Sequence, residues 1–115
     1  MTVPLLRSLL VATDTLTRDQ VRRRLAEVDA EIFGLGVRRL ALFGSVLRNE
    51  ARPDSDVDFL VEFAPGRKSF DRFLALSELL EERLDHSVEL VTTEALSPFL
   101  GPHILAEAVD VVRAA

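Results

Sequence analysis

Apolar side chains recur every three or four residues in two long segments, which is the spacing of one face of a helix. The first segment, residues 17–34, opens with Thr17 and Gln20 at the separation of a capping box, and nearby glycines end it. Its apolar positions are Val21, Leu25, Val28 and Ile32. The second segment spans residues 70–85. Its apolar positions are Phe70, Phe73, Leu76, Leu80 and Leu84. The pattern predicts two amphipathic helices that bury these stripes.

Shorter segments have the composition and the alternation of strands. Residues 37–43 are rich in branched and aromatic side chains and run directly into a Gly-Ser turn. After a polar loop at residues 49–55, residues 56–63 alternate between a face that begins with two aspartates and an apolar face, and residues 87–92 alternate again. A short helix near residues 104–109 and a last extended segment complete the chain. Helices and strands intermix, which predicts an α/β (α+β) domain with a small mixed sheet flanked by helices.

Length and composition limit what the chain can be. It has 115 residues, 48% of them hydrophobic, so we expect residues 17–115 to form a single domain and residues 1–16 to be an N-terminal extension. Cysteine is absent, which excludes disulfides, thiolate metal sites and a cysteine nucleophile. The net charge of -5 argues against holding long nucleic acid by neutralising its phosphates, and it favours a nucleotide or a protein as partner.

The sequence also predicts a cytoplasmic protein that does not enter the membrane. No segment approaches the roughly 18 apolar residues that a membrane span needs. The apolar stretch from Val3 to Ala12 is interrupted by Arg7, and it lacks both a basic leader and a small-residue cleavage site. We therefore do not interpret it as a signal peptide.

Two aspartates, Asp56 and Asp58, stand two residues apart on one face of a predicted strand. Neighbouring carboxylates repel each other unless protons or a cation offset the repulsion. Carboxylate oxygens suit Mg²⁺, which completes its coordination with waters and substrate phosphates, and two such ions can bind both the attacking and the leaving oxygen of a phosphoryl transfer. Glu89, on the next alternating strand, is a candidate third carboxylate, as a metal ligand near the acceptor hydroxyl or as its general base.

The segment before the aspartates is suited to phosphate. Gly44 and Ser45 precede Asp56 by a spacing of ten intervening residues. A glycine turn lets backbone N–H groups approach phosphate closely, the serine hydroxyl adds a donor, and a helical turn over residues 46–51 would present its N-terminus to the anion. Arg48, one helical turn after Ser45, is placed to contact the same phosphates. The spacing thus predicts a site for a metal-bound nucleoside triphosphate.

Residues 43–61, with Gly44-Ser45 and Asp56-Val57-Asp58 at this spacing, closely resemble the signature of the MNT-type minimal nucleotidyltransferases of the DNA polymerase beta-like superfamily. The order of elements matches over about residues 17–109. The resemblance implies that Gly44 and Ser45 bind the triphosphate and that Asp56 and Asp58 bind metal. Glu89 stands where the family usually has aspartate in Val-Asp-Leu-Val, so the third acidic side chain is longer here.

The resemblance also implies a partner. Members of this family often serve as the antitoxin of a two-gene module, and they transfer AMP from ATP to a tyrosine of a HEPN-domain RNase toxin. This chain contains no tyrosine, so a tyrosine acceptor must belong to another protein, whereas self-modification on serine or threonine stays open. Two other functions remain: a scaffold that neutralises its partner by contact alone, and an enzyme that nucleotidylates a small molecule such as an aminoglycoside.

Overall fold

The computed structural model describes residues 15–114, and its centre is a four-stranded sheet with the order β3-β2-β1-β4. The strands are β1 (Val37–Phe43), β2 (Val57–Phe63), β3 (Val88–Thr92) and β4 (Val109–Arg113). β1 pairs antiparallel with β2 and β4, and β2 pairs parallel with β3. The helices are α2 (Arg18–Ala26), α3 (Asp29–Gly34), α4 (Gly44–Leu47), α5 (Phe70–Leu84), the 3₁₀ helix η1 (Thr93–Ala95) and α6 (Gly101–Glu107). The predicted mixed sheet flanked by helices is confirmed.

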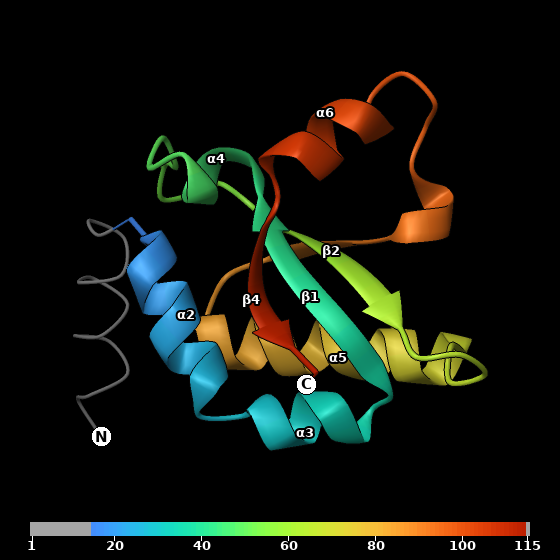
Figure 1. The fold of residues 1–115 in the computed structure, drawn as a ribbon. Helices are drawn as coiled ribbons and strands as arrows, with labels where there is room; N and C mark the ends of the chain where they lie inside the picture. Colours follow the sequence, from blue (N-terminus) through green and yellow to red (C-terminus); the bar gives the residue numbers. More distant parts are fainter. Residues whose placement is uncertain (1–14, 115) are drawn as a thin grey trace, which may run out of the picture.

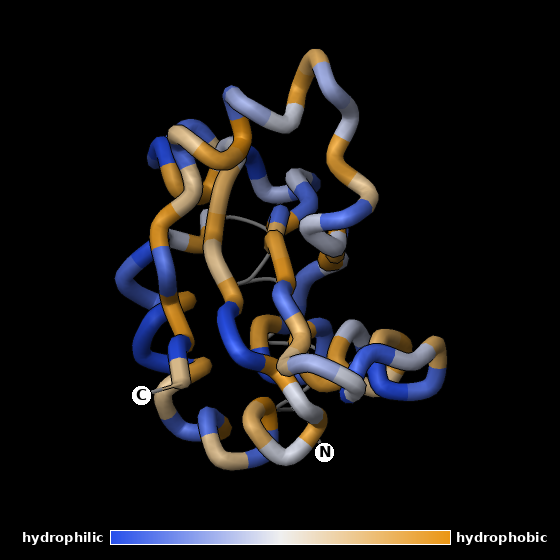
Figure 2. Tube along the Cα trace, turned by 45° about the vertical axis from the view of Figure 1, so that its right-hand side comes forward, coloured by the Kyte–Doolittle hydropathy of each residue, from blue (hydrophilic) through white to orange (hydrophobic). Residues whose placement is uncertain are grey.

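The core lies between one face of the sheet and the helices α2, α3 and α5 (Figure 1). Its largest fully buried side chains come from both layers and include Leu25, Ile32, Leu42, Phe59 and Leu80. Burial of each such side chain stabilises the fold by about 1.5–3 kcal/mol. In Figure 2 the strands carry hydrophobic stretches that give way to hydrophilic residues near their ends. The sheet therefore has a hydrophobic centre that packs in the core, and polar side chains lie at the ends of its strands.

The first predicted helix is in fact two helices, because the chain turns at Glu27 and Val28 between α2 and α3. The Val28 N–H donates to the Leu25 carbonyl at 3.1 Å, three residues back instead of four, and Val28 has a φ of -125°. Val21, Leu25, Val28 and Ile32 are all buried nevertheless. The apolar spacing survives the break, so periodicity could not reveal it.

The second predicted helix is confirmed as α5, but its first apolar residue is not in the core. Leu76, Leu80 and Leu84 are fully buried, whereas Phe70 is 75% exposed. Phe70 follows the N-cap Ser69 directly, at the very start of the helix, and Phe73 is the first of these residues to pack against the core. The helical spacing therefore wrongly placed Phe70 in the buried apolar face of the predicted helix.

The predicted helix near residues 104–109 was wrong at both ends. α6 begins earlier, at Gly101, with Pro102 in its first turn, and it ends at Glu107. Val109 already belongs to β4, where it pairs with Leu42 of β1. The branched residues of β4 complete the sheet instead of extending the helix.

Within residues 15–114, no helix is both long and apolar enough to cross a membrane.

Candidate active site

The two halves of the sequence motif meet at one end of the central strand pair. In the antiparallel register of β1 and β2, Phe43 lies opposite Asp58, and α4 begins at the next residue, Gly44. Gly44 has a φ of +79°, and a Cβ added to it would lie 2.1 Å from Oδ2 of Asp58. The glycine is therefore required for two reasons: its backbone is left-handed, and the Asp58 carboxylate packs directly against it.

Asp58 and Glu89 are neighbours across the parallel strands β2 and β3, where they are register partners. The pKa of Asp58 is raised from 3.8 to about 6, first by burial, then by a hydrogen bond with Glu89 and by the negative charges of Glu89 and Asp56; the charge of Arg48 opposes this. A bound cation would stabilise the ionised form of such a half-buried carboxylate beside two other carboxylates, so the electrostatics of Asp58 suit a cation-binding group.

Asp56 lies one residue before β2, at the edge of the same group. The loop that leads to it is closed by the Arg52 N–H, which donates to the Ser55 hydroxyl at 2.8 Å, and by the Ser55 N–H, which donates to the Arg52 carbonyl at 3.0 Å. The Val57 N–H then donates to the Ser87 carbonyl at 2.9 Å, which joins the start of β2 to the start of β3. Asp56 is exposed, so its carboxylate is free to turn toward solvent or a ligand.

The carboxylates fit the metal that the sequence predicts by their chemistry. Asp58 and Glu89 are adjacent, Asp56 acts on Asp58 through its charge, and all three offer the hard oxygens that Mg²⁺ prefers. Among residues 15–114, however, no three His, Cys, Asp or Glu side chains are gathered into a ready-made cage. Assignment of Asp56, Asp58 and Glu89 as catalytic metal ligands stays a prediction.

Ser45 and Arg48 flank the same end of the sheet. Ser45 is half-buried in the first turn of α4. The helical turn expected over residues 46–51 is instead the four-residue α4, which starts at Gly44 and is too short for a helix dipole to matter. Individual N–H groups and the Ser45 hydroxyl are the available donors. Their contact with phosphate stays a prediction.

Arg48 is paired with two carboxylates. Its Nε lies 2.6 Å from Oε1 of Glu50, and its Nη1 donates to Oε1 of Glu107. The pKa of Arg48 is raised, mainly by the hydrogen bond to Glu107. Glu107 also accepts a long hydrogen bond of 3.4 Å from the Gly44 N–H. Glu107 was not predicted from the sequence. It follows the motif by about 50 residues, and only the pairing of β4 with β1 places it beside Gly44.

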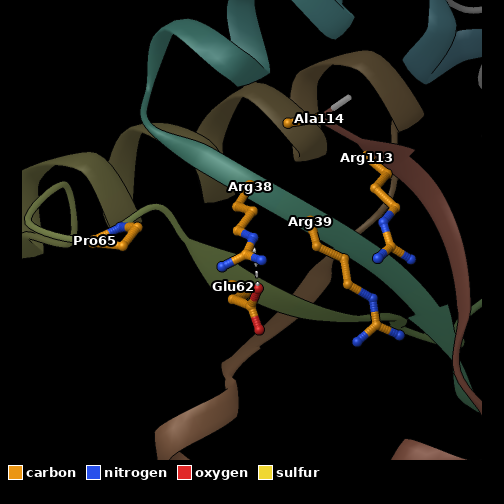
Figure 3. A pocket seen from close by; sticks show the side chains of 6 residues that line it. All are labelled: Arg38, Arg39, Glu62, Pro65, Arg113 and Ala114. Atoms are coloured by element: carbon orange, nitrogen blue, oxygen red, sulfur yellow. Dashed lines mark ion pairs between the residues drawn. The ribbon is translucent and has the colours of Figure 1, made fainter.

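A separate hollow lies at the opposite end of the strands and is shown in Figure 3. Its lining residues are Arg38, Arg39, Glu62, Pro65, Arg113 and Ala114. Arg39 pairs with Glu62 in the strand register, four residues from the Phe43–Asp58 pair, which is about 13 Å along a strand. Arg38 forms an ion pair with Glu62 at 3.5 Å, and Asp110 accepts hydrogen bonds from Arg39 and Arg113. The residues predicted from the sequence meet at the Gly44 end instead, and we take that end as the candidate active site.

Comparison with known proteins shows the family to which the chain belongs. The family model of the nucleotidyltransferase domain matches residues 18–111. The chain belongs to the nucleotidyltransferase domain family. It is similar to a protein of Methanocaldococcus jannaschii named "Putative protein adenylyltransferase MJ0435", with 37% identity over 94 residues that cover 82% of this chain and 97% of the relative.

Solved structures share the fold of this nucleotidyltransferase. A structure described as a minimal nucleotidyltransferase has a TM-score of 0.71 and 36% identity, and the match covers 84% of this chain and 97% of the other. A complex of the tri-AMPylated HEPN toxin of Shewanella oneidensis with an MNT antitoxin also matches, with a TM-score of 0.51 and 22% identity over 75% of this chain and 70% of the other. At that identity the likeness shows the fold alone.

Proposed function

We propose that this nucleotidyltransferase transfers AMP from ATP to a hydroxyl of a partner protein, a HEPN-type RNase toxin that it silences as an antitoxin. The observation that carries the proposal is the packing of the Gly44 backbone directly against Asp58, whose register partner is Glu89. This arrangement places donors for phosphate beside ligands for a divalent cation. The relative named as a protein adenylyltransferase and the fold shared with an MNT antitoxin support the class of acceptor.

Each residue has a role in this reaction. Asp56, Asp58 and Glu89 would hold up to two Mg²⁺ ions, which neutralise charge on the triphosphate and on the attacking oxygen when bound. Ser45 and the backbone beside it donate hydrogen bonds to phosphate oxygens, and Arg48 adds a positive charge. The acceptor oxygen attacks the α-phosphorus, its proton passes to Glu89, and the bond from the α-phosphorus to the bridging oxygen breaks to release pyrophosphate.

The acceptor in this proposal is a tyrosine of the partner. The chain itself has no tyrosine. The described domain is small and carries the carboxylates at one end of an open sheet, so a bulky side chain of another protein can reach them. A small-molecule acceptor would need further walls around the carboxylates to bind it.

Intact-mass spectrometry of the protein encoded beside this one is the direct test. After incubation with this chain, ATP and Mg²⁺, we expect the partner to gain one or more AMP units, and the double variant Asp56→Asn/Asp58→Asn to add none. Phenylalanine in place of each partner tyrosine should then identify the acceptor. If the partner is inhibited equally well by the double variant and gains no mass, the chain neutralises it by contact alone.

A further inference from the structure

Glu107, the last residue of α6, connects the two parts of the proposed triphosphate site. One of its carboxylate oxygens accepts from the Gly44 N–H at 3.4 Å, and the other accepts from Nη1 of Arg48. The side chain of Glu107 is 27% exposed, compared with 50% for Arg48. Its two oxygens thus hold both ends of α4, the turn at the start and the arginine that follows the last residue.

The backbone of α4 is held by the core, in which Val46 and Leu47 are buried, and by the Arg48 N–H, which donates to the Gly44 carbonyl at 3.2 Å. A helix of four residues is far below the length at which helices are stable alone. It is followed by Asn49 with a φ of 58°, a left-handed residue that redirects the chain into the loop. The Arg48 side chain is 50% exposed and is not held by the core, so a clamp from elsewhere in the fold is needed to keep its guanidinium in a constant position relative to Gly44.

Glu107 is well placed to be that clamp, because the sheet holds it. Two residues later, Val109 pairs with Leu42 of β1, the strand that leads into Gly44. The Ala108 N–H caps α6 by donating to the Ile104 carbonyl at 2.8 Å. The carboxylate is thus attached to the same rigid platform as the strand that carries Gly44.

We infer that Glu107 is a positioning residue for the nucleotide, which holds the Gly44–Ser45 turn and the Arg48 guanidinium in the arrangement that binds the triphosphate. The inference rests on the proposed function. A positioning role and a purely electrostatic effect predict opposite changes in nucleotide affinity when Glu107 is neutralised. A carboxylate near a phosphate site repels the phosphate, so its neutralisation should improve nucleotide binding if charge alone mattered. Loss of a positioning residue should weaken binding instead.

Glu107→Gln is the informative variant because it preserves shape and removes charge. A carboxylate accepts from two donors with two oxygens, whereas an amide offers one oxygen and turns an NH₂ group toward the other donor. One of the two contacts must break. The matched control is Glu50→Gln, which removes charge beside the same guanidinium from an exposed side chain that does not bond to Gly44.

Isothermal titration of each protein with a non-hydrolysable ATP analogue and Mg²⁺ tests the inference. We expect Glu107→Gln to weaken analogue binding about tenfold, the loss of one charge-assisted hydrogen bond, and Glu50→Gln to change it by less than about twofold. In transfer assays the KM for ATP should rise in Glu107→Gln by more than kcat falls. Binding as tight as wild type, or tighter, would overturn the inference while leaving the proposed function intact.

Two further measurements separate positioning from loss of structure. The ligand-free Glu107→Gln protein should unfold within a few degrees of wild type, because surface and rim ion pairs contribute little to stability. Glu107→Asp, which keeps both oxygens on a shorter stem, should bind the analogue with an affinity between those of wild type and the Gln variant. An Asp variant no better than Gln would contradict the bridging role. Absence of analogue binding by the wild-type chain would remove the proposed function and the inference together.

Discussion

Replacement of both Asp56 and Asp58 by Asn is expected to lower AMP transfer by about 10³-fold or more, since bound metal supplies several kcal/mol of charge stabilisation in such reactions. The structure gives the reason: Asp58 lies between Gly44 and Glu89, where the phosphate and the acceptor meet in the proposed reaction. An amide retains the size of the carboxylate but not its charge. Metal affinity should fall, and with it the rate.

The same change at Asp58 alone is expected to stabilise the metal-free protein. The pKa of Asp58 is about 6, above its ordinary value of 3.8, because of burial and neighbouring carboxylates, so the ionised form is disfavoured in the fold. A shift of this size would be worth roughly 3 kcal/mol for a dry site, but Asp58 is only half-buried, and solvent screening reduces the gain to about 1 kcal/mol. The cost of the charge is fully present above the folded pKa and disappears below the unfolded pKa.

Denaturant unfolding at two pH values checks the sign. Without metal, Asp58→Asn should be more stable than wild type at about pH 8, and the difference should shrink through pH 6 and vanish near about pH 2.5, where Asp58 is protonated in both states. Saturating Mg²⁺ should stabilise wild type and not the variant. Asp54→Asn, the same change at an exposed aspartate two residues before Asp56, is the matched control and should alter neither stability nor transfer. Full transfer by the double variant would contradict the assignment of these residues.

The sequence predicted strands and turns correctly where a local pattern of side chains determines them. The alternation from Asp56 to Phe63 correctly predicted a strand, and the alternation after Ser87 predicted its neighbour, so the adjacency of Asp58 and Glu89 followed once the two strands paired. The Gly-Ser turn was correctly placed at the end of β1. Each of these depends on residues a few positions apart, for which side-chain spacing is decisive.

Features that depend on tertiary contacts could not be predicted. The turn at Val28 preserves the apolar spacing on both sides, and Phe70 has the right spacing but no core to meet. Glu107 contacts Gly44 only because β4 pairs antiparallel with β1, and the local sequence of α6 does not predict that pairing. The ion pairs of Arg48 with Glu50 and Glu107 were not predicted either, and its contact with phosphate stays a prediction.

Gly44→Ala is expected to have the second large effect, on stability and on nucleotide binding together. The new methyl group would lie 2.1 Å from Oδ2 and 3.0 Å from Cγ of Asp58, and the residue would keep a φ of +79°. Left-handed backbone costs a non-glycine residue about 1–3 kcal/mol, and overpacking adds about 1–3 kcal/mol. Because the obstacle is the Asp58 carboxylate, relief of the clash must move either the turn or Asp58, the proposed metal ligand, so analogue binding should be lost.

Two other glycines separate the causes. Gly66 has a φ of +75° with nothing within 4 Å of an added Cβ, so Gly66→Ala isolates the backbone cost and should destabilise by about 1 kcal/mol without affecting the nucleotide. Gly34 lies in a helix and also has nothing within 4 Å of an added Cβ, so Gly34→Ala should stabilise the protein by up to about 1 kcal/mol. Thermal unfolding and analogue titration of the three variants decide the matter. If Gly44→Ala behaved like Gly66→Ala in both assays, contact between the turn and Asp58 would not be what organises this site, and the phosphate-binding role of the turn would have to be abandoned.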